Sequence, residues 1–327
     1  LDTHPLAVGV VGTYSRACAN RAVGEADLVF YIGSHTGSQV TARWQVPRPG
    51  TPVMHLDIDV REIGRNYPAE IGAVADLRSA LAALNECARR RVPKGIRRPE
   101  VVSRIADFRR EFGRRNQDLV RSEAFPMMPE RILAEVRELL PRDAVITTDV
   151  GWNKNGVGQQ FPVFTPGSVL TPGGFATMGF GPAAAIGAKI AAPGRTVISL
   201  VGDGGFGQNP AFLATALERK LGIVWLVMNN NAFGTIAGLQ KAHFNSTYGT
   251  TFGPNDASAL PNYADVARAY GCEGVRIASA AELKPALKGA LASGKPFVLE
   301  VPMKNNPTPT SGHWNILDIY SPDKDVS

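Results

Sequence analysis

Two short polar motifs contain the residues of this sequence that are best suited to chemistry. Gly202-Asp203-Gly204 follows an apolar run, and Asn229-Asn230-Asn231 follows the next one, with 24 residues between the two motifs. That separation is the length of one β-α-β crossover, in which both parallel strands end at the same edge of the sheet. We therefore expect the carboxylate and the amides to lie close together, at the edge where open α/β sheets bind ligands.

The residue types in these motifs favour a site for a metal ion and a diphosphate. Carboxylate, amide and backbone carbonyl oxygens are ligands that Mg²⁺ accepts. Glycines leave backbone N–H groups open to a phosphate, and a helix beginning at Asn209 would add the positive end of its dipole. An isolated Gly-Asp-Gly most often marks a simple turn, so the spacing to the asparagines is what favours the site. The glycines concerned are Gly202, Gly204, Gly205 and Gly207.

Strand and helix patterns alternate around these motifs. Continuous apolar runs between helices are typical of strands buried on both faces of a parallel sheet. We expect strands over 144–149, 196–203, 223–230 and 297–301 and near 275, and helices over 129–140, 178–192, 209–220, 263–270 and 280–291. This order predicts a doubly wound parallel sheet for the second part of the chain.

The first part of the chain has a shorter alternation of the same kind. β-Rich runs over 6–12, 26–33 and 52–59 alternate with helical segments, the last of them over 77–90. The fold class expected throughout is α/β. The predicted domains are a partial, N-terminally incomplete Rossmann-like domain over 1–91, a linker with its own helix over 92–125, and the doubly wound domain with a C-terminal tail over 126–327.

The composition disfavours several classes of protein. The chain has 327 residues, 20% of them charged, and a net charge of +6, and its densest basic run, 89–98, has no interleaved aromatic residues that would indicate nucleic-acid binding. Cys18, Cys87 and Cys272 form no metal-binding cluster, which favours a reduced, cytoplasmic protein without zinc. Neither a signal peptide nor an apolar stretch long enough to cross a membrane is expected.

The motifs resemble the signature of the thiamine diphosphate (ThDP)-dependent enzymes, in which Gly-Asp-Gly is followed at this distance by Asn-Asn. The resemblance extends over nearly the whole chain and is nearest to the acetolactate (acetohydroxyacid) synthase-like branch. Local matches are His4-Pro5, the segment 26–28, the segment 55–59 and the run GGFATMGFG over 173–181. The first part is similar to that family's middle domain, and the second part is similar to its pyrophosphate-binding domain.

The resemblance implies roles for particular residues. The Mg²⁺ ligands would be the side chains of Asp203 and Asn230 and the carbonyl of Ala232. Met178 would be the apolar wedge that bends the cofactor, the Ala176 carbonyl would accept from its aminopyrimidine, and Ile236 would lie on the substrate side. Further contacts to the cofactor would come from Gly151, Asn153, Gly202, Gly204, Gly205 and Gly234.

The activity implied is ThDP- and Mg²⁺-dependent decarboxylation of a 2-oxo acid followed by ligation to a second carbonyl compound. Two alternatives stay open: decarboxylation without ligation, and a non-catalytic ThDP-binding subunit that needs a partner. An NAD-type dehydrogenase is disfavoured, because 9–14 reads Gly-Val-Val-Gly-Thr-Tyr and lacks the dinucleotide-binding glycine pattern. Some relatives keep FAD in the middle domain, and the sequence leaves FAD binding open.

Several features depart from the family pattern. The family's activating glutamate lies in a pyrimidine-binding domain with no counterpart here, so we expect that domain on another chain or a missing N-terminal segment, and an assembly that is at least dimeric. Leu239 replaces a tryptophan that selects larger acceptors, and Gly151-Trp152-Asn153-Lys154 stands where the nearest relatives have Gly-Gln-His or Gly-x-His. The stretch 232–252 is expected either to close over the cofactor or to be a surface loop. His243 and His313 are candidate proton carriers, with ordinary solvated histidines as the alternative.

Overall fold

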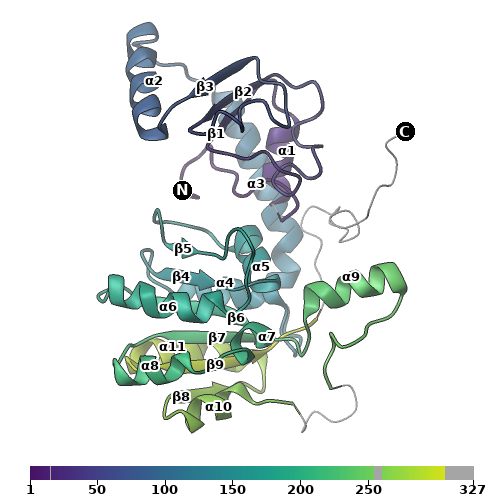
Figure 1. Cartoon of the computed structure of the whole chain (residues 1–327), viewed down its shortest axis with the longest axis vertical. Helices are drawn as coiled ribbons and strands as arrows, with labels where there is room; N and C mark the ends of the chain where they lie inside the picture. Colours follow the sequence, from purple (N-terminus) through teal and green to yellow (C-terminus); the bar gives the residue numbers. More distant parts are fainter. Residues whose placement is uncertain (15, 254–259, 306–327) are drawn as a thin grey trace. The chain divides into compact units, whose positions relative to one another are not determined.

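The computed structural model describes residues 1–14, 16–253 and 260–305. The described chain divides into two compact units, one formed by 1–3 and 115–305 and the other by 4–114, with the division inside the long helix α3 (Pro99–Val120) (Figure 1). Every strand pairing within the described sheets is parallel. The α/β class predicted from the sequence is therefore confirmed.

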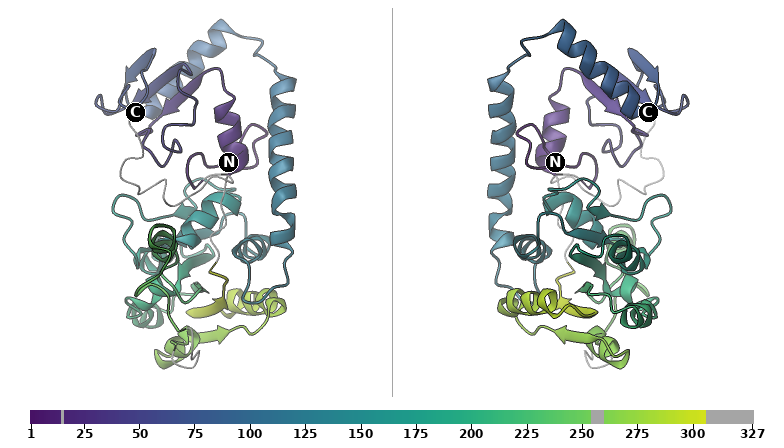
Figure 2. Two further views of the ribbon diagram at one scale, coloured as in Figure 1. Left: turned by 90° about the vertical axis from the view of Figure 1, so that its right-hand side faces the viewer. Right: turned by 90° about the vertical axis from the view of Figure 1, so that its left-hand side faces the viewer.

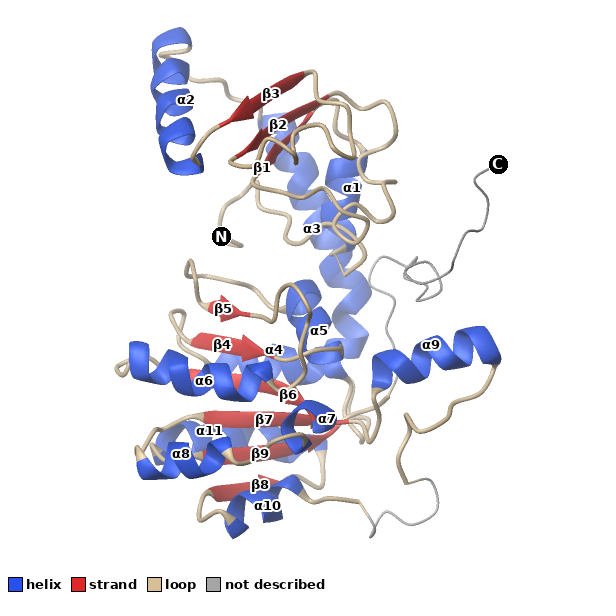
Figure 3. Cartoon of the chain, in the orientation of Figure 1, coloured by secondary structure: helices blue, strands red, loops and turns tan. Residues whose placement is uncertain are grey.

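The larger unit is built on a six-stranded sheet with the order β5-β4-β6-β7-β9-β8 (Figure 3). From β4 the chain goes outward to β5 and then crosses back to β6 on the other side of β4, so the direction of winding reverses between β4 and β6. A doubly wound sheet of this kind binds ligands at the carboxyl ends of the strands next to such a reversal. The strands are β4 (Val145–Thr148), β5 (Val169–Leu170), β6 (Val197–Gly202), β7 (Val224–Asn229), β8 (Glu273–Arg276) and β9 (Phe297–Pro302).

Helices cover both faces of this sheet (Figure 2). One face packs against α4 (Pro129–Leu139), α5 (Trp152–Gln160) and α11 (Leu283–Ser293). The opposite face packs against α6 (Phe180–Ala191), α7 (Asp203–Gly207), α8 (Phe212–Glu218) and α10 (Tyr263–Ala269). A 3₁₀ turn η2 (Ala280–Glu282) precedes α11, and α9 (Gly234–Phe244) follows β7.

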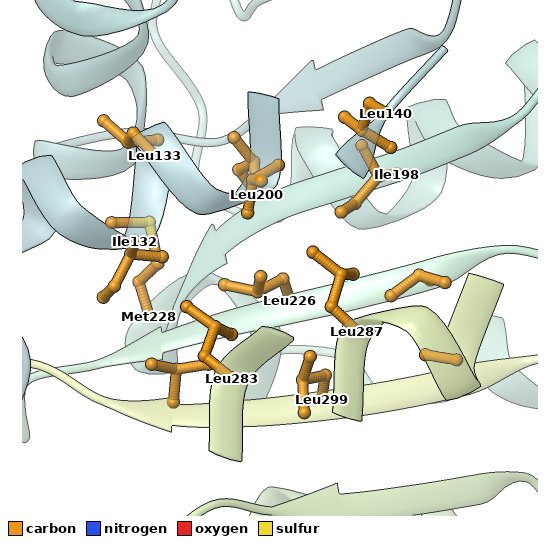
Figure 4. Packing of buried hydrophobic residues seen from close by; sticks show 14 of the residues in the cluster. Ile132, Leu133, Leu140, Ile198, Leu200, Leu226, Met228, Leu283, Leu287 and Leu299 are labelled. Atoms are coloured by element: carbon orange, nitrogen blue, oxygen red, sulfur yellow. The ribbon is translucent and has the colours of Figure 1, made fainter. Parts of the chain in front are cut away.

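The alternation of side chains along the strands divides the core into two layers. On β7, Leu226 and Met228 join the cluster beneath α4 and α11 (Figure 4), whereas Trp225 and Val227 point to the cluster beneath α6 and α8. All six β7 residues are buried. Because successive strand residues face opposite sides, a strand covered on both faces is apolar at most positions, and that is the nearly continuous apolar run recognised in the sequence.

The smaller unit contains a three-stranded sheet with the order β1-β2-β3. Its central strand β2 is largely buried, whereas all four residues of β3 are exposed and α2 has no buried residue. Helix α3 contributes Phe108, whose ring lies beneath the guanidinium of Arg21 at 4.3 Å from the ring centroid. The elements are α1 (Ala17–Gly24), β1 (Val29–Ile32), β2 (Val53–Asp57), β3 (Ile71–Val74) and α2 (Leu77–Arg91).

Two predictions of local structure were wrong. Residues 6–12 form no strand, because Gly9 and Gly12 adopt φ angles of +92° and +107° that a strand does not accommodate. The helix expected from Asn209 begins at Phe212, and the Asn209 side chain instead accepts from Ala211 N at 3.3 Å in a local turn. The short elements α1, α5, β3, β5 and α9 were not foreseen.

The structure also bears on two expectations from composition. Within the described residues, no helix is both long and apolar enough to span a bilayer. Cys18, Cys87 and Cys272 are all free thiols. Burial raises the pKa of the Cys18 and Cys272 thiols, which disfavours the reactive thiolate form.

Candidate functional site

The two polar motifs meet at the carboxyl edge of the six-stranded sheet, as the crossover spacing predicted. β6 ends at Gly202 and β7 at Asn229, and the two strands are hydrogen-bonded neighbours in parallel register. Asp203 opens the short helix α7 and is 4% exposed. Its carboxylate therefore lies within the protein rather than in solvent, directly beside the turn that follows β7.

Burial changes the protonation of Asp203. Desolvation raises the pKa of this carboxyl group to about 6, against the opposing effect of backbone N–H groups from its own helix and from the turn at Asn230 and Ala232. A buried carboxylate needs compensating positive charge. This group is consequently suited to a cation, which would favour the ionised form.

The Asn230 amide lies close to two oxygens at the Asp203 turn. One atom of the Asn230 amide lies 3.0 Å from Asp203 Oδ1 and 3.0 Å from the Ala232 carbonyl oxygen. Asn230 Nδ2 donates to Asn305 Oδ1 at 3.1 Å, which turns the amide oxygen toward the other two oxygens. In the opposite amide orientation, the nitrogen would donate to both oxygens. The second orientation satisfies the amide without any ion, whereas the first, which points the amide oxygen at two other oxygens, would need a cation between them.

The spacing of this arrangement is compatible with a small cation. Adjacent ligands of an octahedral Mg²⁺ with bonds of about 2.0–2.1 Å lie about 2.9 Å apart, whereas the longer Ca²⁺ bonds give about 3.3 Å or more. The 3.0 Å separations are near the smaller value, and they are also ordinary N–H···O hydrogen-bond distances. The described part of the chain contains no group of three or more His, Cys, Asp or Glu side chains that could bind a metal. A cation at this turn would therefore be bound by amide and backbone oxygens in addition to Asp203.

The three consecutive asparagines have different environments. Asn229 is buried, and its Nδ2 donates to Glu300 Oε1 at 2.8 Å while its Oδ1 accepts from Asn231 N at 3.0 Å. Asn231 adopts a left-handed conformation with φ of +50°, which turns the chain sharply. Only Asn230 therefore directs its amide at Asp203, as the resemblance implied, and its two neighbours form the turn.

Glycines allow the backbone to approach closely at this edge. A Cβ added to Gly205 would lie 2.7 Å from Asp149 Oδ1, and one added to Gly234 would lie 2.7 Å from Asn230 Nδ2. Neither distance is compatible with a side chain unless its surroundings move. Glycine is thus required sterically at both positions, independently of any contact to a ligand.

Asp149 is a second buried carboxylate that sequence analysis did not single out. It is fully buried at the end of β4, accepts from Val150 N at 2.8 Å and Gly181 N at 3.0 Å, and its pKa is raised by desolvation. These bonds tie the end of β4 to the start of α6 and place the carboxylate against Gly205. The available signal was an acidic residue directly after a buried strand, the same pattern as at Asp203.

Gly151 and Asn153 form the turn between β4 and α5. Gly151 has φ of +95°, and a Cβ there would lie 3.4 Å from Thr235 Oγ1 at the start of α9. Asn153 is buried, accepts from Asp149 N at 2.9 Å and donates to Val150 O at 3.0 Å, close to Gly202. Asn153 holds its own turn in shape, and its contact to a diphosphate stays a prediction.

Met178 and Ala176 lie in the loop before α6. A Cβ at Gly204 would lie 3.0 Å from Met178 Cε and 2.5 Å from the ring of Phe233, so Gly204 separates two apolar side chains. Ala176 has φ of +49°, an uncommon conformation for a residue with a Cβ. The structure thus brings Met178 to the Asp203 turn, while the cofactor contacts of both residues stay predictions.

The stretch after the asparagines is helical rather than a simple loop. Helix α9 begins at Gly234, and Ile236 and Leu239 lie one turn apart on it, with Ile236 48% exposed. Neither alternative expected for 232–252 was a helix, because the glycines and polar residues of this stretch leave no apolar repeat with the helical period. The side chain of His243 and all of His313 lie outside what is described.

Comparisons with known proteins agree with this geometry. Residues 1–84 match the central domain of thiamine pyrophosphate enzymes, and residues 149–301 match their C-terminal TPP binding domain. The two matches together cover more than two thirds of the chain. The chain belongs to the thiamine pyrophosphate (thiamine diphosphate) enzymes, and this confirms the family predicted from the Gly-Asp-Gly and asparagine motifs.

Within that family the chain is similar to large subunits of acetolactate synthase. It is 34% identical to the probable acetolactate synthase large subunit of Methanocaldococcus jannaschii, over 92% of this chain and 50% of the relative. It is 29% identical to the acetolactate synthase isozyme 2 large subunit of Escherichia coli and to the large subunit of Lactococcus lactis, over 91% of this chain in each case and 52% and 50% of those relatives. The chain spans about half the length of the curated relatives it matches.

Proposed function

We propose that this protein is a ThDP- and Mg²⁺-dependent enzyme that decarboxylates a 2-oxo acid and joins the remaining fragment to a second carbonyl compound. The observation that supports this most directly is the meeting of the Asn230 amide with Asp203 Oδ1 and with the Ala232 carbonyl oxygen, at 3.0 Å from each. The similarity to acetolactate synthase large subunits supports the reaction type.

In this proposal the residues of the β6–β7 edge hold the charged end of the cofactor. Asp203 and Asn230 would bind Mg²⁺ through side-chain oxygens and Ala232 through its carbonyl. The charges of the Asp203 carboxylate and of the diphosphate would be offset by the bound metal, and backbone N–H groups at the start of α7 would face the phosphates. The glycines with this role are Gly202, Gly204 and Gly205, and Gly151, Asn153 and Gly234 border the same space.

Other residues orient the reacting end. When bound, ThDP supplies the carbon nucleophile and the electron sink for loss of CO₂. Met178 offers an apolar surface beneath the cofactor, next to Gly204, and Ala176 offers its carbonyl as an acceptor. Ile236 and Leu239 present an apolar helix face toward the substrate, which excludes water from the reacting carbons.

We also propose that this protein needs partners to complete its active site. A pyrimidine-binding domain, in the same protein or in a partner chain, completes the cofactor site, and the functional assembly is at least a dimer. The support for this is the family pattern, in which the cofactor lies between two subunits. Sedimentation of the purified protein with and without ThDP and Mg²⁺, together with turnover of pyruvate in each fraction, tests the assembly. Activity confined to a monomer would contradict it.

The decisive test is cofactor affinity in Asp203→Ala and Asn230→Ala variants. Each should weaken Mg²⁺-dependent ThDP binding by more than about 100-fold, since even partners that only orient metal ligands typically contribute about 10–100-fold. Equilibrium dialysis measures binding, and pyruvate consumption with product analysis separates ligation from simple decarboxylation. Asp143→Ala, which removes an exposed aspartate just before β4, at the opposite end of the strand from the site, is the matched control. Unchanged affinity in both site variants would refute the proposal.

A further inference from the structure

Glu300 is a fully buried carboxylate in the middle of the six-stranded sheet. It lies on β9, is 0% exposed, and interrupts an otherwise apolar strand. Its Oε1 accepts from Asn229 Nδ2 at 2.8 Å, and its Oε2 accepts from Tyr263 N at 2.7 Å and Ala264 N at 3.3 Å. Both oxygens therefore act as acceptors, on two different parts of the chain.

Each of these bonds orders a segment beside the Asp203 turn. Through Asn229, whose Oδ1 accepts from Asn231 N at 3.0 Å, Glu300 sets the start of the left-handed turn that contains Asn230. Through Tyr263 N, it holds the start of α10. The Tyr263 ring in turn packs against Phe206 of α7, with ring centroids 5.5 Å apart.

A role in stability alone does not account for this carboxylate. A buried charge is expensive, and apolar residues of similar size are often as stabilising as a buried ion pair. The only ion-pair partner recorded for Glu300 within the described residues is Arg276, at 3.3 Å and with its side chain 36% exposed. What a carboxylate provides, and an apolar residue cannot, is two fixed acceptors.

We propose that Glu300 is a positioning residue for metal binding: it orients Asn229, and thereby presents the Asn230 amide and the Ala232 carbonyl to the ion. The inference rests on the proposed Mg²⁺ and ThDP site. It adds a residue from β9, a third strand, to a site otherwise formed by the ends of β6 and β7. Residues of this kind, which orient ligands without touching the metal, commonly change metal affinity strongly.

The donor and acceptor pattern predicts which substitutions fail. In Glu300→Gln the new amide needs its oxygen for Tyr263 N, so its NH₂ group faces the NH₂ group of Asn229. Flipping the Asn229 amide only moves the conflict to Asn231 N. In Asn229→Asp, two carboxylates face each other. The exchange Asn229→Asp with Glu300→Gln restores a single donor–acceptor pair, with the NH₂ group now on residue 300, and keeps an acceptor for both Tyr263 N and Asn231 N.

The experiment compares these variants by Mg²⁺ titration at fixed ThDP, followed by calorimetry, with the melting temperature recorded for each protein. Glu300→Gln and Asn229→Asp should each weaken Mg²⁺ binding by about tenfold. The double exchange should return the affinity to within about threefold of the original, a non-additivity expected only for directly interacting side chains. Glu273→Gln, on the exposed edge strand β8, is the matched control and should leave the affinity unchanged.

The outcomes separate the two proposals. A Glu300→Gln protein that melts earlier but binds Mg²⁺ normally overturns the positioning role, and so does a double exchange that recovers nothing. If Asn230→Ala lowers the affinity while Glu300→Gln does not, only the positioning role fails. If neither changes it, the metal site itself is refuted. Should Glu300→Gln not fold, Asn229→Ala replaces it, because it leaves the bonds from Glu300 to α10 intact, and the same tenfold loss is expected.

Discussion

The two units of this chain contain parallel sheets that differ in how completely they are covered. In the six-stranded sheet, β4, β6, β7 and β9 are buried along nearly their whole length. In the three-stranded sheet only the central β2 is largely buried, and β3 is exposed at every residue. The same α/β pattern in the sequence thus accompanies two very different degrees of burial.

The covered six-stranded sheet holds carboxylates away from solvent. In the covered sheet, Asp149, Asp203 and Glu300 are at most 4% exposed, and each carboxylate is held by backbone or amide donors. Low solvent access strengthens such polar interactions and makes an unpaired group costly. The smaller unit also has buried carboxylates, at Asp57 and Glu62, but there Glu62 pairs with exposed Arg65 and Asp59 with exposed Arg61. We therefore expect mutations to have large effects in the six-stranded unit and small ones in the other.

The same leucine truncation on one helix of each unit tests this contrast most strongly. Leu287→Ala on α11 should cost about 2–5 kcal/mol of unfolding free energy, because the side chain is fully buried against the sheet. Leu84→Ala on α2, where the side chain is 47% exposed, should change it by less than about 0.5 kcal/mol. Hydrogen exchange in denaturant, read separately on peptides of each unit, measures both. Equal losses would break the contrast.

A glycine-to-alanine pair should change stability with opposite signs. Gly205→Ala places a methyl group against the fixed Asp149 carboxylate and should destabilise the six-stranded unit by about 1–3 kcal/mol. Gly113→Ala, in the exposed interior of α3 with open space around it, should stabilise that helix by about 0.5–1 kcal/mol. Thermal unfolding measures both changes. A stabilising Gly205→Ala would show that the close approach to Asp149 is not rigid.

The reaction products test whether Leu239, on α9 of the larger unit, lies on the substrate side. Leu239→Trp on α9 should shift ligation toward an acceptor that is one methylene longer, 2-oxobutanoate over pyruvate, by about tenfold, the usual effect of one methylene in an apolar pocket. Competition between the two acids, with both products quantified, gives the ratio. Lys241→Trp, an exposed position two residues further along α9, is the control. The same shift in both variants would remove Leu239 from the substrate side.

The smallest effect is expected on the exposed strand of the smaller unit. Ile71→Thr on β3 keeps a β-branched side chain and removes apolar surface that is 59% exposed. The unfolding free energy should change by less than about 0.5 kcal/mol. Denaturant unfolding followed by circular dichroism is sufficient for this comparison. A loss of several kcal/mol would mean that β3 is covered in solution.

Much of the larger unit follows from local patterns. The strands around 145–148, 197–202, 224–229 and 297–302 were expected within one or two residues, because a strand covered on both faces is apolar at most positions. Strand β5 has only two residues, and α9 starts with a glycine and has no clear apolar stripe, so neither produces a readable period. The false strand at 6–12 shows that an apolar run is insufficient where glycines turn the chain.

The sequence by itself determined the family and the pairing of Asp203 with an asparagine. Both depend on residue types and on a crossover length, and these are local properties of the chain. The resemblance already implied that Asn230 is the partner of Asp203. Only the tertiary structure decided that Asn229 binds Glu300 and that Asp149 lies against Gly205. These contacts join residues 56 to 71 positions apart, and which atoms meet depends on the register of neighbouring strands, which no single segment encodes.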